Sequence, residues 1–299
     1  MEDIVIQAAG TGDFPAIAAW IVEICRVPAQ QCLHSWAGED AQALCSQLHK
    51  FWDDGELIYR IAMRGGEMVG VMGSEYDEAL GRAWLHGPNV AAADWETVAP
   101  VLFGRVLDGL PRPIIQLDAY LNAENVRGVR FYQEREFVEN GYACEYSLAA
   151  SDRVTERAQE CIPLQEGHQK NFIQLYETIF PEGYYSGERI VSMTGRTHQV
   201  FTRMEAGELR GFVVASVDAG AATGEIQFLG VQDGWRGRGF GRDLLMVGVD
   251  WLFEQAGVAA VSLNVREEEV QPRRLYESVG FRPRFRGTAL RKTLQERER

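Results

Sequence analysis

The chain has 299 residues, 46% of them hydrophobic, and a formal net charge of −13 at pH 7. This length corresponds to about two domains, and the hydrophobic content is sufficient for substantial buried cores. No apolar run reaches the ~20 residues of a membrane-spanning helix, and the acidic balance argues against nucleic acid, whose phosphates need basic surfaces. We therefore expect a soluble protein with neither a membrane nor a nucleic acid as partner, and for which a cationic partner is easier to accommodate.

The charge is divided unevenly between the two halves. Residues 1–150 carry 10 Lys or Arg against 22 Asp or Glu, and the remaining residues carry 20 against 21. The halves therefore net −12 and −1, which add to the total of −13. This difference indicates two unlike domains.

The N-terminal residues, the cysteines and the histidines favour a cytoplasmic protein without metal. The first residues are acidic and lack a basic segment before an apolar run, unlike a secretory signal. The 5 cysteines form no C-x-x-C pair, and their odd number argues against a disulfide framework. The 5 histidines show no metal-ligand spacing. We expect a cytoplasmic location, buried thiols and no metal.

The predicted elements follow one order in both halves. The first half predicts, in chain order, a strand at 4–8, a helix at 16–25, strands at 56–63, 68–76 and 83–90, a helix at 95–110, and strands at 114–120 and 142–148. The second half predicts a strand at 161–164, a helix at 167–179, strands at 199–204 and 210–217, a strand from 225, a helix at 243–255, a strand at 258–265 and a helix at 272–279. This repetition predicts a duplicated α/β chain with domains at 1–150 and 158–299, joined by a polar linker at 149–159.

Residues 225–241, EIQFLGVQDGWRGRGFG, join an apolar strand to a glycine loop flanked by arginines. Glycines at 237, 239 and 241 let the backbone approach an anion, and the helix that begins beside them offers unpaired N–H groups and a positive dipole end. The segment is therefore predicted to hold phosphates.

Spacing separates three kinds of phosphate loop. A Walker loop needs Lys and then Ser or Thr after its last glycine, where this chain has Arg242 and Asp243. A dinucleotide loop needs Gly-x-Gly-x-x-Gly, whereas these glycines are spaced evenly by two. The third pattern, Gln/Arg-x-x-Gly-x-Gly/Ala after a strand, is matched by Arg236, Gly239 and Gly241. Residues 275–281, LYESVGF, add a second motif. Together the two motifs resemble those of the GNAT acyltransferase superfamily.

This resemblance implies a tandem form with two GNAT folds, each with a central mixed, mostly antiparallel sheet flanked by helices. It also implies acetyl-CoA as co-substrate and direct acetyl transfer to an amine in a ternary complex. Tyr276 takes the position of the family's general acid, which protonates the departing thiolate, although a lone helical tyrosine is usually a packing residue. The cofactor-binding positions implied are Leu229, Gly230, Val231, Arg236, Gly237, Arg238, Gly239, Phe240 and Gly241.

Glu225 is the candidate general base, because it lies eleven positions before Arg236, as does the catalytic glutamate of histone-acetylating members. The alternative is an ordinary exposed glutamate at the start of a strand. The chain departs from the family at Glu269 and Pro272, where Asn and Ala are frequent, so contacts made by that asparagine are in doubt.

The first half is predicted to be a degenerate copy that does not bind coenzyme A. Residues 125–137, NVRGVRFYQEREF, place Asn125 and Tyr132 in the motif positions of the family. No glycine occurs between Gly87 and Gly104, so nothing there resembles the phosphate loop. A monomer with an intramolecular pseudo-dimer is expected, and a homodimer is the alternative.

The acceptor is not identified by the sequence. In this superfamily the segment at 180–196 builds much of the acceptor site, and Glu182, Tyr184 and Tyr185 are candidates to line it, or else to form a packed lid. The leading hypothesis is an N-acetyltransferase for a primary amine of a small molecule or peptide. The rival is a non-catalytic module that senses acyl-CoA or binds a protein.

Overall fold

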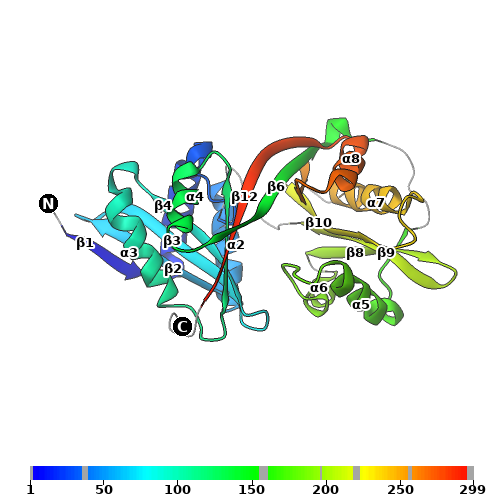
Figure 1. Cartoon of the computed structure of the whole chain (residues 1–299), viewed down its shortest axis with the longest axis horizontal. Helices are drawn as coiled ribbons and strands as arrows, with labels where there is room; N and C mark the ends of the chain where they lie inside the picture. The colour runs from blue at the N-terminus through cyan, green and yellow to red at the C-terminus, as the bar shows by residue number, and fades with distance from the viewer. Residues whose placement is uncertain are drawn as a thin grey trace. The chain divides into compact units, whose positions relative to one another are not determined.

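The computed structural model describes residues 3–35, 40–154, 161–195, 197–217, 223–254 and 258–294. The chain divides into two compact units (Figure 1). The first comprises Met1–Ala143 together with the C-terminal segment from Arg286 onward, and the second comprises Cys144–Phe285. Among the helices of the described ranges, none is long and apolar enough to cross a membrane.

The first unit is a mixed sheet with helices on both faces. Its strands lie in the order β1 (Ile4–Ala8), β2 (Leu57–Arg64), β3 (Glu67–Asp77), β4 (Arg82–Val90), β5 (Gln116–Asn122) and β12 (Arg282–Thr293). Only β4 and β5 pair in parallel among these neighbours. The helices are α1 (Phe14–Cys25), α2 (Ala41–Asp53), α3 (Trp95–Leu107) and α4 (Val126–Gln133).

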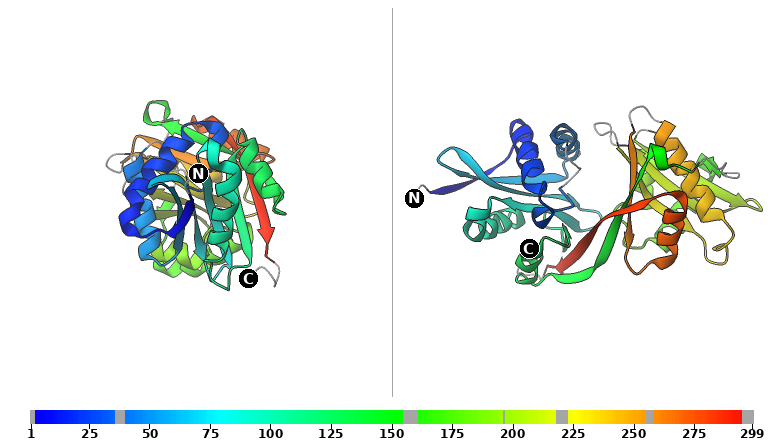
Figure 2. Two further views of the ribbon diagram at one scale, coloured as in Figure 1. Left: turned by 90° about the vertical axis from the view of Figure 1, so that its left-hand side faces the viewer. Right: turned by 90° about the horizontal axis from the view of Figure 1, so that it is seen from above.

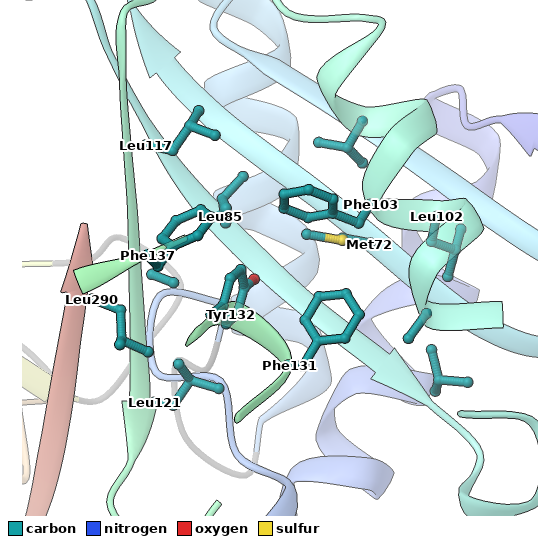
Figure 3. Packing of buried hydrophobic residues seen from close by; sticks show 14 of the residues in the cluster. Met72, Leu85, Leu102, Phe103, Leu117, Leu121, Phe131, Tyr132, Phe137 and Leu290 are labelled. Carbon is teal, nitrogen blue, oxygen red and sulfur yellow. The ribbon is translucent and has the colours of Figure 1, made fainter. Parts of the chain in front are cut away.

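Each face of this sheet has its own hydrophobic core. One core packs α1 and α2 against residues of β2 and β3, and the other packs α3 and α4 against β3, β4, β5 and β12 (Figure 2). Aromatic rings dominate the second core, where Phe131 and Tyr132 of α4 meet Phe103 of α3 edge to face (Figure 3). Buried residues of α1 recur every three or four positions, as expected of a helix with one apolar face.

The second unit repeats this architecture. Its strands lie in the order β6 (Val138–Ala149), β11 (Ala260–Arg266), β10 (Thr223–Val231), β9 (Glu208–Val217), β8 (His198–Glu205) and β7 (Cys161–Pro163). The helices are α5 (Gln169–Ile179), α6 (Gly187–Met193), α7 (Phe240–Glu254) and α8 (Val270–Val279). Helices α7 and α8 cover one face of the sheet, and α5 and α6 cover the other. Short 3-10 turns lie at Thr11–Asp13, Pro28–Gln30, Ala92–Asp94, Ala150–Asp152 and Glu166–His168.

The predicted duplication of a mixed α/β fold is confirmed, but the units differ from the expected boundaries of 1–150 and 158–299. Residues Gly287–Thr293 of β12 pair with Asn122–Gln116 of β5, which places the C-terminal strand in the first unit. Residues of β6 from Cys144 onward belong to the second unit, where β6 neighbours β11. Each sheet therefore gains the backbone partner that its otherwise open edge requires from the last strand of the other repeat. Residues 155–159 of the predicted linker lie outside the described residues.

Candidate functional site

The candidate site of the second unit begins where two parallel strands separate. Strands β10 and β11 pair only from Thr223↔Ala260 to Glu225↔Ser262, whereas β10 continues to pair with β9 as far as Val231. A bulge between Ile226 and Phe228 interrupts the register with β9. Beyond Glu225, the β11-facing side of β10 thus offers backbone groups to which an extended ligand arm can bond like an added strand.

Gly230 serves packing at this place rather than the approach of a ligand. A Cβ there would lie 2.7 Å from Phe212 Cζ and 3.0 Å from Ile179 Cδ1. The glycine therefore makes room for the phenylalanine ring on the α5 side of the sheet. The backbone groups of Gly230, like those of Leu229 and Val231, lie at the edge of the gap.

The predicted glycine loop connects β10 to the first turn of α7. Gly237 and Gly239 have φ of 77° and 89°, a left-handed conformation that favours glycine, and no heavy atom lies within 4 Å of a Cβ at either position. Helix α7 begins at Phe240, and Asp243 N–H donates to Gly239 C=O at 3.1 Å. The N–H groups at the start of the 15-residue helix have no partner within the helix and provide an anion-binding end.

Arg236 and Arg238 of the loop are exposed, and Arg242 is half-buried. Arg236 is exposed; its Nη2 lies 3.3 Å from Asp233 Oδ1 and its Nε donates to Val231 C=O at 3.2 Å. Arg242 Nη1 donates to Ser278 Oγ at 3.0 Å. Arg238 is also exposed, and its guanidinium lies 4.6 Å from the ring centre of Trp235. Long exposed side chains of this kind can turn towards phosphate oxygens at small cost.

Trp235 fixes the loop onto the helix, a role that the sequence analysis missed. Its ring stacks on Phe240 with centroids 5.6 Å apart and planes at 20°. Arg210 of β9 lies over the same ring at 4.9 Å and donates to Gln232 Oε1 at 2.8 Å. Phe240 and Arg238 lie close to Trp235 in sequence, whereas Arg210 comes from another strand and could not be paired with it from the sequence alone. The contacts of Trp235 with Phe240 and Arg210 join the loop to α7 and β9.

Tyr276 lies on α8 with 8% of its surface exposed, and its ring packs 6.1 Å from that of Phe281. Burial raises the pKa of its hydroxyl well above the ordinary value, and the nearby carboxylate of Glu269 adds to that rise. In the described part of the chain this hydroxyl has no hydrogen-bond partner. Tyr276 therefore keeps its proton at neutral pH and can donate it to a ligand.

Glu225 lies on β10 on the face opposite α7. Its neighbours Gly224 and Ile226 pack against α7, and alternation along the strand turns Glu225 away from that helix. Burial raises the pKa of its carboxyl, and a hydrogen bond from Gln227 opposes that rise. Glu225 is half-buried, and within the described ranges it forms no ion pair with a cation of the chain. Such a group is costly unless it serves binding or catalysis.

The predicted acceptor segment at 180–196 contains a short helix, α6, and a packed pair of tyrosines. The rings of Tyr184 and Tyr185 meet edge to face at 4.6 Å, and Tyr185 also lies 6.2 Å from the buried His198. Tyr176 of α5 donates from its hydroxyl to Tyr185 C=O at 2.7 Å. These contacts hold both tyrosines in place, which favours the alternative that they form a packed lid. Glu182 forms contacts of its own, and Arg196 lies outside the described residues.

The first unit has the same separation of strands, but its own chain fills it. Parallel pairing of β4 and β5 ends at Leu85↔Ala119. Beyond that point Cys32 forms an antiparallel bridge with Leu121, and Leu33 N–H donates to Tyr120 C=O at 2.7 Å. The side of β4 facing this gap is also occupied, because Gly87 N–H donates to Cys32 Sγ at 3.1 Å.

Buried amides hold this filling segment in place. Gln31 donates from Nε2 to Cys25 C=O at 2.8 Å and accepts from Asn122 Nδ2 at 2.8 Å. Asn125 Nδ2 donates to Gln31 C=O at 3.1 Å, and the Tyr132 hydroxyl donates to Gly87 C=O. We call the residues Gln31, Cys32 and Leu33 the filling segment. No local sequence pattern predicts the filling segment, because it is irregular and pairs with a strand far along the chain.

Comparisons with known proteins agree with this geometry. Residues 169–281 match the acetyltransferase (GNAT) family, so the second unit contains a domain of that family. Over 63 residues the chain is 49% identical to the mycothiol acetyltransferase of Beutenbergia cavernae. That match spans 21% of this chain and 21% of the relative, about a fifth of its length.

Two solved structures resemble the whole chain in fold. A GCN5-related N-acetyltransferase from Sphaerobacter thermophilus superimposes with a TM-score of 0.76 at 17% identity, covering 97% of this chain and 95% of that one. A tandem GNAT protein from the clavulanic acid biosynthesis pathway superimposes with a TM-score of 0.69 at 12% identity, covering 97% and 98%. The predicted tandem GNAT architecture is thereby confirmed. The described residues contain no group of three or more His, Cys, Asp or Glu placed to hold a metal ion.

Proposed function

We propose that this chain is an acetyl-CoA-dependent N-acetyltransferase whose active site lies in the second unit. One observation carries the proposal: the gap between β10 and β11 opens beside the loop that leads into α7. Backbone groups at Leu229 and Val231 would bond the pantetheine arm, and the loop N–H groups of residues 237–241 would bond the pyrophosphate. Arg236 and Arg238 would turn towards the phosphates.

The chain's own residues supply the acid and the base of the reaction. The acceptor nitrogen bonds to the acetyl carbonyl carbon, and the bond from that carbon to sulfur breaks. Glu225 takes one proton from the ammonium form of the acceptor, and Tyr276 gives its proton to the departing sulfur. The nitrogen loses a second proton as the amide forms, and this proton returns to Tyr276 and restores its hydroxyl. Tyr276 suits this role because its raised pKa keeps the hydroxyl protonated. No acyl-enzyme is formed, since transfer is direct.

The first unit does not bind coenzyme A in this proposal. The filling segment supports this, because Gln31, Cys32 and Leu33 already bond to both walls of the gap. The chain also has no glycine between Gly87 and Gly104 from which a phosphate loop would be built. We therefore propose one coenzyme A site per chain. We also propose that the protein is monomeric and cytoplasmic.

The acceptor proposed is a primary amine of a small molecule or a peptide. The half-buried carboxylate of Glu225 supports it, because among the described residues no cation forms an ion pair with it and an ammonium group would do so. The similarity to a mycothiol acetyltransferase supports acetyl transfer.

Coenzyme A binding and thiol release test the proposal together. Calorimetry should give one site per chain, and a panel of primary amines should release thiol from acetyl-CoA. Tyr276→Phe should keep coenzyme A binding and lose turnover by about two orders of magnitude, as for removal of a general acid. Tyr76→Phe, a tyrosine of the first unit, is the matched control and should behave as wild type. Tight binding with no release for any amine would instead favour a non-catalytic acyl-CoA sensor.

A further inference from the structure

A second carboxylate shares the sheet face of Glu225. On β6 the side chains of Cys144, Tyr146 and Leu148 are buried in the core beneath α7 and α8. Alternation along the strand therefore turns Glu145 to the opposite face. The next strand, β11, alternates in the same way. Its Val261 and Leu263 lie in that core, so Ser262 between them points to the opposite face.

The strand order brings these residues to one region of that face. β6 neighbours β11, and β11 neighbours β10. Ser262 of β11 pairs with Glu225 and lies on the same face. Glu145, Ser262 and Glu225 thus come from three adjacent strands, with Glu145 and Glu225 on either side of the serine's strand.

The charges of this region leave one negative charge uncompensated. Arg284 Nη1 lies 3.1 Å from Glu145 Oε1, and the Glu145 side chain is only 15% exposed. The guanidinium of Arg284 is 50% exposed, so water partly screens it. Glu225 has no ion-pair partner in the described part of the chain. Two carboxylates and one guanidinium therefore leave a net charge of one unit, which a single ammonium ion would neutralise.

The two carboxylates also interact with each other. Burial raises the pKa of Glu145 to about 7 although Arg284 lowers it, and the negative charge of Glu225 adds to the rise. Two carboxylates that interact titrate as a pair, so the first proton is bound by the pair rather than by either residue alone. A base of this kind is matched to the removal of a proton from an ammonium group near neutral pH.

We propose that Glu145 and Glu225 together form the acceptor-binding base of the second unit, so that a strand following the first repeat supplies half of it. Glu225 contacts the acceptor nitrogen, and Glu145 is a positioning residue that acts through Glu225. One proton leaves the ammonium nitrogen, is held by the carboxylate pair, and passes to solvent after the amide has formed. This inference rests on the proposed function and narrows the acceptor to an amine that binds as a monocation at its reacting nitrogen.

The other polar groups on this face define what else can influence the pair. Arg284 of β12 forms an ion pair with Glu145, and the buried His198 of β8 lies on the same face as Glu225, two strands away. His198 bonds through Nδ1 to Thr197 Oγ1 at 2.8 Å, and its strand position faces Ser216 of β9. Ser216 also pairs with Glu225. Histidine protonation would add a positive charge near the pair, so His198→Asn is included as a reference variant.

Opposite changes of charge should move the pH profile in opposite directions. The acidic limb of kcat/KM for the best amine is expected near pH 7 in the wild type. Glu145→Gln removes a negative neighbour and should move that limb to lower pH by about one unit, whereas Arg284→Gln should move it to higher pH by a similar amount. Glu177→Gln, an exposed carboxylate of α5, should leave the limb in place. Limbs that stay fixed, or that move together in the first two variants, would overturn the proposal.

A titration without substrate separates this inference from the proposed function. Protein labelled with ¹³C at the glutamate carboxyls should show a resonance that titrates near pH 7 and disappears in Glu145→Gln. In Glu225→Gln its midpoint should fall by about one unit, and an unchanged midpoint would show that the two carboxylates do not form a pair. A coupled titration without turnover of any amine would refute the proposed function and the acceptor role with it.

Discussion

Replacing Gly230 by alanine tests whether this glycine serves packing. A Cβ at residue 230 would lie 2.7 and 2.9 Å from Phe212 Cζ and Cε1, and 3.0 Å from Ile179 Cδ1. Phe212 is fully buried and packs edge to face on Phe172 at 5.1 Å, so its ring has little space to retreat. Adding a methyl group to a filled core costs about 1–3 kcal/mol. For a chain of this size the midpoint of thermal unfolding should fall by roughly 2–12 °C.

A double-mutant cycle gives the decisive comparison. Phe212→Leu removes the ring atoms that the new methyl group would meet, so Gly230→Ala should cost at least about 1 kcal/mol less in the Phe212→Leu background. Unfolding by urea measures each free energy, and calorimetry measures coenzyme A binding in the same four proteins. Equal costs in both backgrounds would refute the packing explanation. So would an unchanged stability combined with lost binding, which would mean that Gly230 is needed for the ligand.

Three further predictions concern the loop and the first unit. In Gly239→Ala, the alanine must adopt the left-handed conformation of residue 239, with φ of 89°, at a cost of roughly 1–2 kcal/mol. This variant should bind coenzyme A about tenfold more weakly by calorimetry. Undiminished affinity would exclude this loop from the site. Gln31→Ala removes two buried hydrogen bonds and should lower the free energy of unfolding by about 2–4 kcal/mol. Coenzyme A should still bind once per chain, because the first unit has no glycine loop for the phosphates; a second site would show that the missing loop does not prevent binding. Burial lowers the pKa of His34 to about 4 and that of His86 to about 3, so the unfolded chain binds more protons below pH 6.5, and urea midpoints should fall as the pH drops from 6.5 towards 3. Midpoints that stay constant over that range, or that fall equally in a His86→Gln variant, would contradict these neutral histidines.

The sequence predicted the parts whose signal is local. The glycines of the loop could be predicted because each acts at its own position. It does so either through the freedom of its backbone or through the space left by its missing side chain. Most strands and most of the longer helices were predicted because buried positions recur at regular spacing, as Phe14, Ile17 and Ile21 do in α1. The C-terminal strand β12 was not predicted. Helix α6 was missed, because its seven residues are too few for a periodic pattern and it starts at a glycine.

The helix α2 was missed although its signals were present. Asp40 accepts hydrogen bonds from the backbone of Gln42 and Ala43, as an N-cap does, and Ala43, Leu44, Leu48 and Phe51 form a buried stripe. The partners of β6 and β12 could not be predicted in the same way. Both strands have alternating residues that suit either sheet, so the choice depends on contacts with β5 and β11 that are remote in sequence.

The position of β6 gives the first repeat a role in the candidate site without a cofactor of its own. Tyr146 of β6 is fully buried, its hydroxyl donates to Glu277 Oε1 at 3.0 Å, and Arg273 Nε donates to that hydroxyl at 3.1 Å. Both partners lie on α8, the helix of the candidate acid Tyr276, whose ring is 6.5 Å from that of Tyr146. One residue earlier, Glu145 faces the other side of the sheet and interacts with Glu225. In the proposed mechanism, β6 therefore contacts the helix of the candidate acid on one face of the sheet and carries Glu145 beside the candidate base on the other.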